Sequence, residues 1–335
     1  MTDVDLQIIK NCGFIKYLLN HGADISSLEL EYDENETLAS MNPSIWINED
    51  GSAYINIRAV NYNLLNSRYR EYTQNDQPIA YVCKDQNHLK TENYFGTFDI
   101  NTLQINDISK VQMLYLHDPC WDFHGLEDAR IIHWDDNIYL CGVRRDVKDN
   151  GEGRMELTKI KYIDNCWQEI ERLRIPAAGN DDAYLEKNWM PIIDKPWHWI
   201  KWCAPVEIAN YDPVIQQLNI EFRNDAWNYY RGDSHLININ GYYYCFVHDV
   251  LNYKLNDASN ARMSLYKHYI LKFDNDMNYV GKFGPFSYDN RFNIEFGCGL
   301  AKYNGKCYLT YSENDALSLI VKFDEKIFEM LDYYE

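Results

Sequence analysis

Two adjacent carboxylates in the stretch His124–Arg130 (HGLEDAR) are the first candidates for chemistry in this sequence. Glu127 and Asp128 follow a glycine and precede an apolar, strand-like run. Successive side chains of a regular strand point to opposite faces, so only one of the two carboxylates is expected to face a site. That carboxylate could act as a general acid or base. The alternative is a turn carboxylate that pairs with Arg130.

Basic side chains at three other places could bind an anion. Arg144 and Arg145 are adjacent at the end of the following predicted strand, and paired guanidinium groups suit bidentate binding of phosphate or carboxylate. Lys187 and Asn188 precede a tryptophan, which suits a sugar, because the aromatic face packs on the ring while the polar groups bind hydroxyls or phosphate. His248 ends an aromatic strand. The structural alternatives are a solvated strand end for the two arginines, a charged turn for Lys187 and Asn188, and a buried structural histidine for His248.

The composition excludes several classes of function. The 335 residues are 46% hydrophobic and 15% aromatic, which is enough for a packed core and favours strands. The net charge of −19 argues against nucleic acid or an anionic membrane as the main partner. We therefore expect a small-molecule or oligosaccharide substrate, with neither nucleic acid nor membrane as partner. The sequence leaves open whether the protein forms a homo-oligomer.

The cysteines and the N-terminus predict a cytoplasmic protein. The nine cysteines are scattered singly, without a CxxC pair, as is typical of small core residues in a reducing compartment. The first residues lack the features of a signal peptide, and no apolar run approaches the length of a membrane span. Arg231–His235 (RGDSH) contains a cell-adhesion tripeptide, which we interpret as a coincidence in such a chain. No nucleotide-binding loop or complete metal-ligand motif appears, so we expect no metal and no cofactor.

The pattern of short strands predicts one large all-β domain. Residues 1–35 are expected to form an N-terminal helical extension, with a helix over residues 6–20 that stops at His21-Gly22. Four later segments share one form, in which a turn precedes an aromatic-rich strand that ends in a polar residue: 52–58, 137–143, 241–248 and 305–311. Several follow a shorter strand, as at 128–133, 235–239 and 296–301. Repeated hairpins of this kind favour a five-bladed β-propeller over residues 36–335, with inner strands around a central channel.

Taken in order, five segments resemble glycoside hydrolase family 130, the β-mannoside phosphorylases and β-mannosidases, and related propeller-type mannosyltransferases. Gly125–Arg130 resembles the family's G-x-E-D-P-R motif, with alanine in place of proline. Glu186–Pro191 resembles its K-N-x-x-x-x-P segment. The other segments are 42–45 with 54–61 for the first blade, 232–248 for the stretch ending in L-x-x-Y-H, and 293–301 with 311–315 for the last blade. The chain departs from the family at 232–237, where a glycine-rich motif is reduced to Gly-Asp-Ser-His-Leu-Ile.

The resemblance implies a five-bladed propeller and assigns roles to particular residues. Asp128 corresponds to the general acid. Phosphate would be bound by Arg144, Arg145, Lys187 and His248. The sugar would be bound by Arg58, Asn61, Glu127, Asn188, Asp315 and Glu295, and Glu127 could also orient an arginine. Inorganic phosphate or a sugar phosphate would be the co-substrate.

Three functions remain open at this point. A phosphorylase needs no base, since phosphate is already an anionic nucleophile, and the same scaffold could transfer a sugar from a sugar phosphate or a nucleotide sugar as a glycosyltransferase. A hydrolase needs a second carboxylate, for which Glu295 and Asp249 are the candidates, roughly 6.5–9.5 Å from Asp128. A non-catalytic propeller that binds glycans or proteins would instead pair Arg145 and Lys187 with carboxylates.

Overall fold

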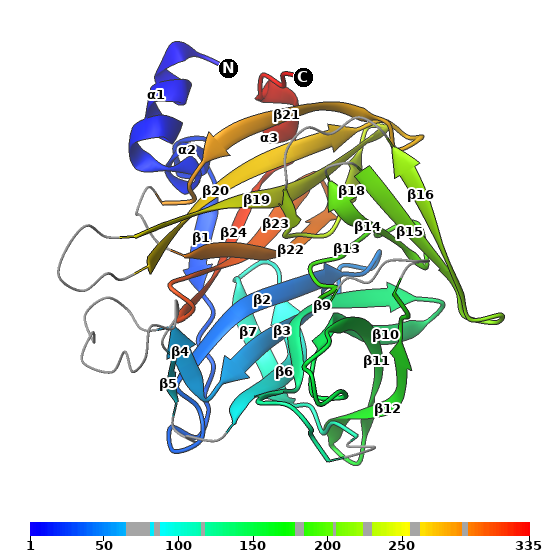
Figure 1. Ribbon diagram of the computed structural model, residues 1–335. Coiled ribbons are helices and arrows are strands. Elements are labelled where there is room, and N and C mark those ends of the chain that lie inside the picture. Colours follow the sequence, from blue (N-terminus) through cyan, green and yellow to red (C-terminus); the bar gives the residue numbers. More distant parts are fainter. Residues whose placement is uncertain are drawn as a thin grey trace.

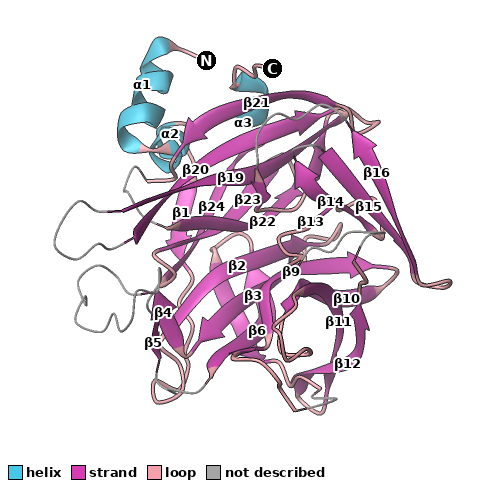
Figure 2. Cartoon of the chain, viewed as in Figure 1, coloured by secondary structure: helices cyan, strands magenta, loops and turns pink. Residues whose placement is uncertain are grey.

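The computed structural model describes residues 1–64, 81–83, 88–114, 118–177, 184–203, 206–223, 230–254, 262–289 and 294–335. Within these residues five β-sheets surround a common centre, which is the arrangement of a five-bladed β-propeller (Figure 1). Helices are confined to short segments near the two ends of the described chain (Figure 2). The all-β, five-bladed fold predicted from the sequence is confirmed. Asn293, at the start of the last-blade motif, lies outside the described residues.

Each of the first four blades is an antiparallel meander that starts at its innermost strand. The first contains β2 (Ala39–Ile47), β3 (Ala53–Val60), β6 (Leu89–Asp99) and β7 (Gln104–Lys110). The second contains β9 (Leu126–Trp134), β10 (Asn137–Arg144), β11 (Arg154–Ile163) and β12 (Cys166–Arg174). The third contains β13 (Met190–Pro191), β14 (His198–Cys203), β15 (Val206–Asp212) and β16 (Gln217–Arg223). The fourth has an inner strand in two pieces, followed by three long strands: β17 (Arg231–Gly232), β18 (Ile237–Ile239), β19 (Tyr242–Lys254), β20 (Arg262–Phe273) and β21 (Tyr279–Phe286).

The fifth blade closes the ring with a strand from the beginning of the chain. It contains β22 (Glu295–Tyr303), β23 (Lys306–Glu313), β24 (Leu317–Asp324) and, as its outermost strand, β1 (Asp24–Ser27). β1 pairs antiparallel with β24. The propeller therefore begins before residue 36, and the predicted division after residue 35 does not separate an extension from the domain. Smaller pieces are β8 (Phe123–His124), which runs parallel to β6, and the pair β4 (Tyr62–Leu64) and β5 (Tyr81–Cys83).

The aromatic-rich segments singled out in the sequence are the second strands of four blades: β3, β10, β19 and β23. In β10 every residue from Tyr139 to Arg144 is buried. A strand buried on both faces reads as a continuous apolar run rather than an alternating one. Adjacent blades cover these strands on both sides, which explains the pattern.

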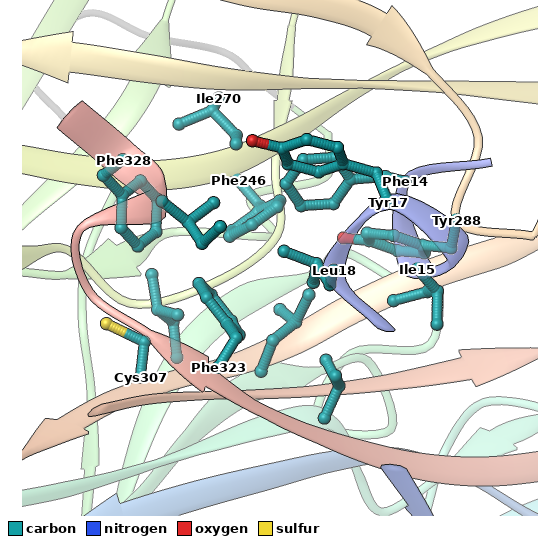
Figure 3. Close-up of a cluster of buried hydrophobic side chains, with 14 of the residues drawn as sticks. Phe14, Ile15, Tyr17, Leu18, Phe246, Ile270, Tyr288, Cys307, Phe323 and Phe328 are labelled. Atoms are coloured by element: carbon teal, nitrogen blue, oxygen red, sulfur yellow. The ribbon is translucent and has the colours of Figure 1, made fainter. Parts of the chain in front are cut away.

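The N-terminal segment packs into the propeller as two helices. α1 (Asp3–Cys12) and α2 (Phe14–Asn20) are divided at Gly13, whose φ of +89° interrupts the single helix predicted over residues 6–20. Side chains of α2 lie in one buried cluster with the fourth and fifth blades and with the short C-terminal helix α3 (Ile327–Met330), as Figure 3 shows. Among the described residues, no helix has the length and apolarity needed to cross a membrane.

Candidate active site

A β-bulge near the start of β9 determines how the two adjacent carboxylates are presented. Glu127 pairs with Val143 and Arg130 pairs with Cys141, so two residues of β9 oppose Gly142 alone. Asp128 has a φ of +50°. A Cβ atom at Gly142 would lie 2.4 Å from the carbonyl oxygen of Glu127, so this bulge requires glycine at that position. A bulge re-aims side chains and interrupts their alternation.

Similar irregularities occur in other inner strands. β2 has a bulge between Met41 and Ser44, where Asn42 has a φ of +49°, and β22 has a bulge between Phe296 and Gly299. Asn188, just before β13, has a φ of +61°. The inner strands of different blades therefore use comparable local distortions to turn polar side chains toward the centre.

Arg58 of β3 binds both carboxylates of the opening motif. Its Nη1 donates a hydrogen bond to Asp128 Oδ1 at 2.6 Å, and its Nη2 lies 3.6 Å from Glu127 Oε1. The prediction that only one carboxylate faces the site is therefore wrong, because the bulge brings both to one guanidinium group. Arg58 also donates to the hydroxyl groups of Tyr62 and Thr91, and its side chain is only 7% exposed. Each nitrogen of the Arg58 guanidinium group therefore makes a hydrogen bond, and Arg58 positions the two carboxylates; its predicted contact with the sugar stays a prediction.

Asp128 is held as an ionised carboxylate. Its Oδ1 also accepts a hydrogen bond of 2.6 Å from Asn42, whose own oxygen accepts one from Ser312 at 2.5 Å. Burial alone would raise the pKa of Asp128, but Arg58, Lys187 and the hydrogen bond from Asn42 lower it below the usual value. Asp128 therefore carries a negative charge at neutral pH in the free protein.

Asp315 and Lys187 complete the charged cluster. Asp315 lies in the turn after β23 with a φ of +51°. Burial and the neighbouring charges of Asp128 and Glu127 raise its pKa to about 6, although Arg58 and Lys187 act in the opposite direction. Three carboxylates thus share two cations, so the cluster retains a proton on Asp315 up to slightly acidic pH.

The four residues predicted to bind phosphate differ in their partners and exposure. Arg144 is 1% exposed, with its Nε 2.8 Å from Glu156, so it is a structural ion-pair partner and the prediction for it is corrected. Arg145 donates to the carbonyl of Gly151 and to the hydroxyl of Tyr184, and it forms no ion pair with any described residue. The side chain of Lys187 has neither a hydrogen bond nor an ion pair within the described part of the chain. His248 is 2% exposed. Neither Arg145 nor Lys187 is therefore neutralised by a carboxylate of the described residues.

Arg130 binds backbone carbonyl groups and forms no ion pair with a carboxylate of the described residues. Its Nη1 donates to the carbonyl of Asp128 at 2.9 Å, and its Nε donates to the carbonyl of Asp233 at 2.8 Å. It is fully buried. The alternative of a turn carboxylate paired with Arg130 is therefore wrong, and this side chain joins the bulge of β9 to the fourth blade.

Three residues predicted to bind sugar lie in different surroundings. Asn61 uses its amide to hold the start of β6, donating to the carbonyl of His88 and accepting from the backbone of Lys90, so the prediction for it is corrected. Glu295 is 1% exposed, and its two oxygens accept hydrogen bonds from the backbone of residues 288 and 289. It is a buried structural carboxylate and not a free base or sugar ligand. Asn188 is 6% exposed, and its Oδ1 is buried without a hydrogen-bond partner among the described residues, which leaves it for a ligand.

Sequence reasoning missed several polar residues of this region: Asn42, Tyr62, Asp233 and His268. Asn42 belongs to the first-blade motif, but nothing in the sequence showed that it would contact Asp128, 86 residues later. Asp233 lies in the RGDSH segment that was interpreted as a coincidence. The departure of that segment from the family's glycine-rich motif was the available signal.

Comparisons with known proteins support the fold. The sequence matches no protein-family model and no curated protein. Among solved structures, the β-1,2-mannobiose phosphorylase of Listeria innocua is similar with a TM-score of 0.55 and 12% identity, over 92% of this chain and 96% of that one. A glycosyl hydrolase from Bacteroides ovatus gives a TM-score of 0.53 and 14% identity, over 87% and 85% of the two chains.

A third structure comes from family GH130 of mannoside phosphorylases, which contains glycoside hydrolases that target β-1,2-mannosidic linkages in Candida mannan. It gives a TM-score of 0.50 and 12% identity, over 87% of this chain and 86% of that one. These likenesses confirm the predicted resemblance at the level of the fold. The chain is a five-bladed β-propeller similar to those of mannoside phosphorylases and glycosyl hydrolases.

Proposed function

We propose that this protein is a carbohydrate-active enzyme that cleaves a β-mannoside with inversion, using inorganic phosphate as the nucleophile. The observation that supports this most directly is Lys187, which has no ion-pair partner among the described residues and whose positive charge acts on Asp128 and Asp315. A phosphorylase requires a proton donor for the leaving oxygen and cations for the phosphate, but no general base. The similar structures include a β-1,2-mannobiose phosphorylase, which suggests the linkage to test first.

The roles follow from the charges. Asp128 would protonate the leaving oxygen, as the resemblance implies, while Lys187, Arg145 and His248 would bind phosphate. Glu127, Asn188 and Asp315 would bind sugar hydroxyls. Asp128 is ionised in the free protein, partly because of the positive charge of Lys187. A bound phosphate would neutralise that charge and so raise the pKa of Asp128, which would then take up the proton that it delivers.

A phosphorolysis assay tests the proposal. Incubation with β-1,2-mannobiose and phosphate is expected to yield α-mannose 1-phosphate, detected by ³¹P NMR, because inversion converts the β-linkage to an α-phosphate. Lys187→Met is expected to raise the KM for phosphate by roughly 10- to 100-fold, since a hydrogen bond to a charged group contributes about 1.5–3 kcal/mol. Release of mannose without phosphate would indicate hydrolysis, and no turnover of any β-mannoside would indicate a binding protein.

Hydrolysis is the second candidate, because the similar structures also include glycosyl hydrolases. It has less support from the site. Of the two predicted bases, Glu295 is buried and both of its carboxylate oxygens accept hydrogen bonds. Asp249, which follows His248 in the chain, is exposed. A glycosyltransferase reaction from a sugar phosphate would be the reverse of phosphorolysis and would use the same residues.

Asp315→Asn is expected to stabilise the fold while impairing activity. A carboxyl group whose pKa is raised on folding contributes stability below its unfolded pKa, and that contribution is lost as the pH rises through the folded value of about 6. At pH 8 the native protein therefore holds an unfavourable charge, and its removal is expected to raise the free energy of unfolding by on the order of 1–3 kcal/mol. Urea denaturation at pH 4 and pH 8 measures this, with Asp249→Asn as the exposed control. An equal effect at both pH values would contradict it.

We also propose that the protein acts in the cytoplasm. The cysteines whose side chains are described are all free: Cys12, Cys120, Cys141, Cys166, Cys245, Cys298 and Cys307. Several of them are buried in the core, as expected for a reducing compartment.

A further inference from the structure

Four buried ionisable side chains form a continuous row from His248 into the fourth and fifth blades. The Nδ1 of His248 is hydrogen-bonded to Asp233 Oδ1. The other oxygen of Asp233 lies 3.2 Å from Nδ1 of His268, and Nε2 of His268 lies 3.4 Å from Glu295. All four side chains are at least 97% buried. Such a row of buried charges is costly unless every member is paired, so its geometry constrains where the protons are.

The central histidine carries the positive charge of the row. Burial lowers the pKa of His268, but its two carboxylate neighbours outweigh this and raise it to about 9. The pKa of His248 is instead lowered, chiefly by burial and also by the charges of His268 and Arg231, although Asp233 opposes this. Among the described residues Tyr266 also lies against the ring of His248, with ring centroids 5.2 Å apart. At neutral pH the row therefore contains a cationic His268 and a neutral His248.

The protons of His248 follow from this arrangement. Asp233 is ionised and can only accept, so Nδ1 of His248 carries the hydrogen. In a neutral imidazole the second nitrogen, Nε2, is then without a hydrogen and can only accept a hydrogen bond. Tyr266 connects this ring to the main site, since the charges of Asp315 and Asp128 both act on it.

We propose that Asp233 is a positioning residue that holds His248 as the Nδ1–H tautomer, so that Nε2 accepts the O–H of a hydrogen phosphate ion and discriminates it from sulfate. Hydrogen phosphate has a hydroxyl group to donate at neutral pH, whereas sulfate has none. An acceptor at this position favours the first anion and repels the second, as a site built around one hydrogen bond rejects the analogue that lacks it. This inference rests on the proposed function, because it takes phosphate to be the anion that binds at His248.

Asp233→Asn tests the inference because an asparagine of the same size can donate its amide hydrogen to Nδ1. His248 would then change to the Nε2–H tautomer, and its outer nitrogen would become a donor. Asp249→Asn is the matched control, since Asp249 is the exposed neighbour of His248 and lies outside the row. Circular dichroism and the Tm of both variants show whether they are folded, and Glu295→Gln, which leaves the Asp233–His248 contact unchanged, gives a second measurement if Asp233→Asn is unstable.

Two readouts separate this inference from the proposed function. Histidine ¹⁵N NMR at pH 7.5 is expected to show His248 protonated at Nδ1 in the native protein and in Asp249→Asn, and at Nε2 in Asp233→Asn. Calorimetric titration with phosphate and with sulfate is expected to give at least about 10-fold tighter binding of phosphate in the native protein. That ratio is expected to fall toward one in Asp233→Asn.

Four results would overturn the inference. A native His248 with its proton on Nε2 would contradict the tautomer. A phosphate-to-sulfate ratio that stays the same in folded Asp233→Asn would contradict the selectivity. The expected tautomer without binding of either anion would overturn the anion-recognition role and, separately, the phosphorylase proposal. In Glu295→Gln the native tautomer is expected to persist, and its loss there would show that the row as a whole, and not Asp233, sets it.

Discussion

Asp128→Asn is expected to lower kcat/KM for β-mannoside cleavage by about 10²- to 10⁴-fold, the usual contribution of a positioned general acid. Asparagine retains an oxygen that can accept from Arg58 and Asn42, so the local geometry should persist. It cannot transfer a proton to the leaving oxygen. The loss of activity should therefore appear in the chemical step.

The leaving group provides the control for this variant. The dinitrophenolate leaving group of a 2,4-dinitrophenyl β-mannoside departs without protonation. Asp128→Asn is therefore expected to retain most of the native rate with that substrate. Steady-state kinetics on β-1,2-mannobiose and on the aryl mannoside measure the difference. Unchanged turnover of the disaccharide would exclude Asp128 as the acid, and equal losses on both substrates would point to a role in binding instead.

Arg58→Met is expected to have the largest effect on stability. Removing one partner of a buried ion pair leaves uncompensated charge and costs about 3–5 kcal/mol. Here the guanidinium group is close to both Asp128 and Glu127, and its charge also lowers the pKa of Asp315. Without it, the pKa of Asp128 would rise toward or above its unfolded value, and the pKa of Asp315 would rise further above its own.

The pH dependence distinguishes this electrostatic effect from lost packing. A carboxylate whose folded pKa is depressed contributes stability above its unfolded pKa, and Arg58 provides that contribution for Asp128. The destabilisation should therefore be largest at pH 8 and smaller at pH 4, where the carboxylates left without Arg58 take up protons in the native state of the variant as well as in the unfolded state. Chemical denaturation of Arg58→Met at the two pH values measures this, with Arg58→Lys, which keeps the charge, as the control. A loss of equal size at both pH values would indicate a packing effect.

The fold could be predicted from the sequence wherever its turns are marked by glycine, asparagine or aspartate. The strand hairpins of four blades carry such turns, and their buried second strands read as aromatic runs. The third blade was not recognised as a hairpin. Its second strand, β14, follows Trp197, which has a φ of +62° without being a typical turn residue. The break between α1 and α2 depends on a single glycine, which a periodic apolar pattern does not reveal.

The candidate site could be predicted in part, because its residue types are visible while their contacts are not. Asp128 and Lys187 were identified from local motifs, but whether a cation is free depends on distant strands. Arg144 is paired with Glu156 of the neighbouring strand β11, whereas the adjacent Arg145 forms no ion pair among the described residues. The bulge at Asp128 was also hidden, since it depends on the pairing of β9 with Gly142. Alternation is a sound rule for regular strands, and it failed here because the strand is irregular where the chemistry is expected.

The pairing of β1 with β24 also affects how the chain folds during synthesis. β1 leaves the ribosome almost 300 residues before its partner, so four blades can form while the ring is still open. During that time α2 and β1 have no complete surface to pack on, and the inner strands lack the neighbour that closes the centre. An unpaired strand edge invites association with other chains. The pairing that closes the ring forms last. The chain is therefore most exposed to association with other chains during synthesis, before β24 pairs with β1.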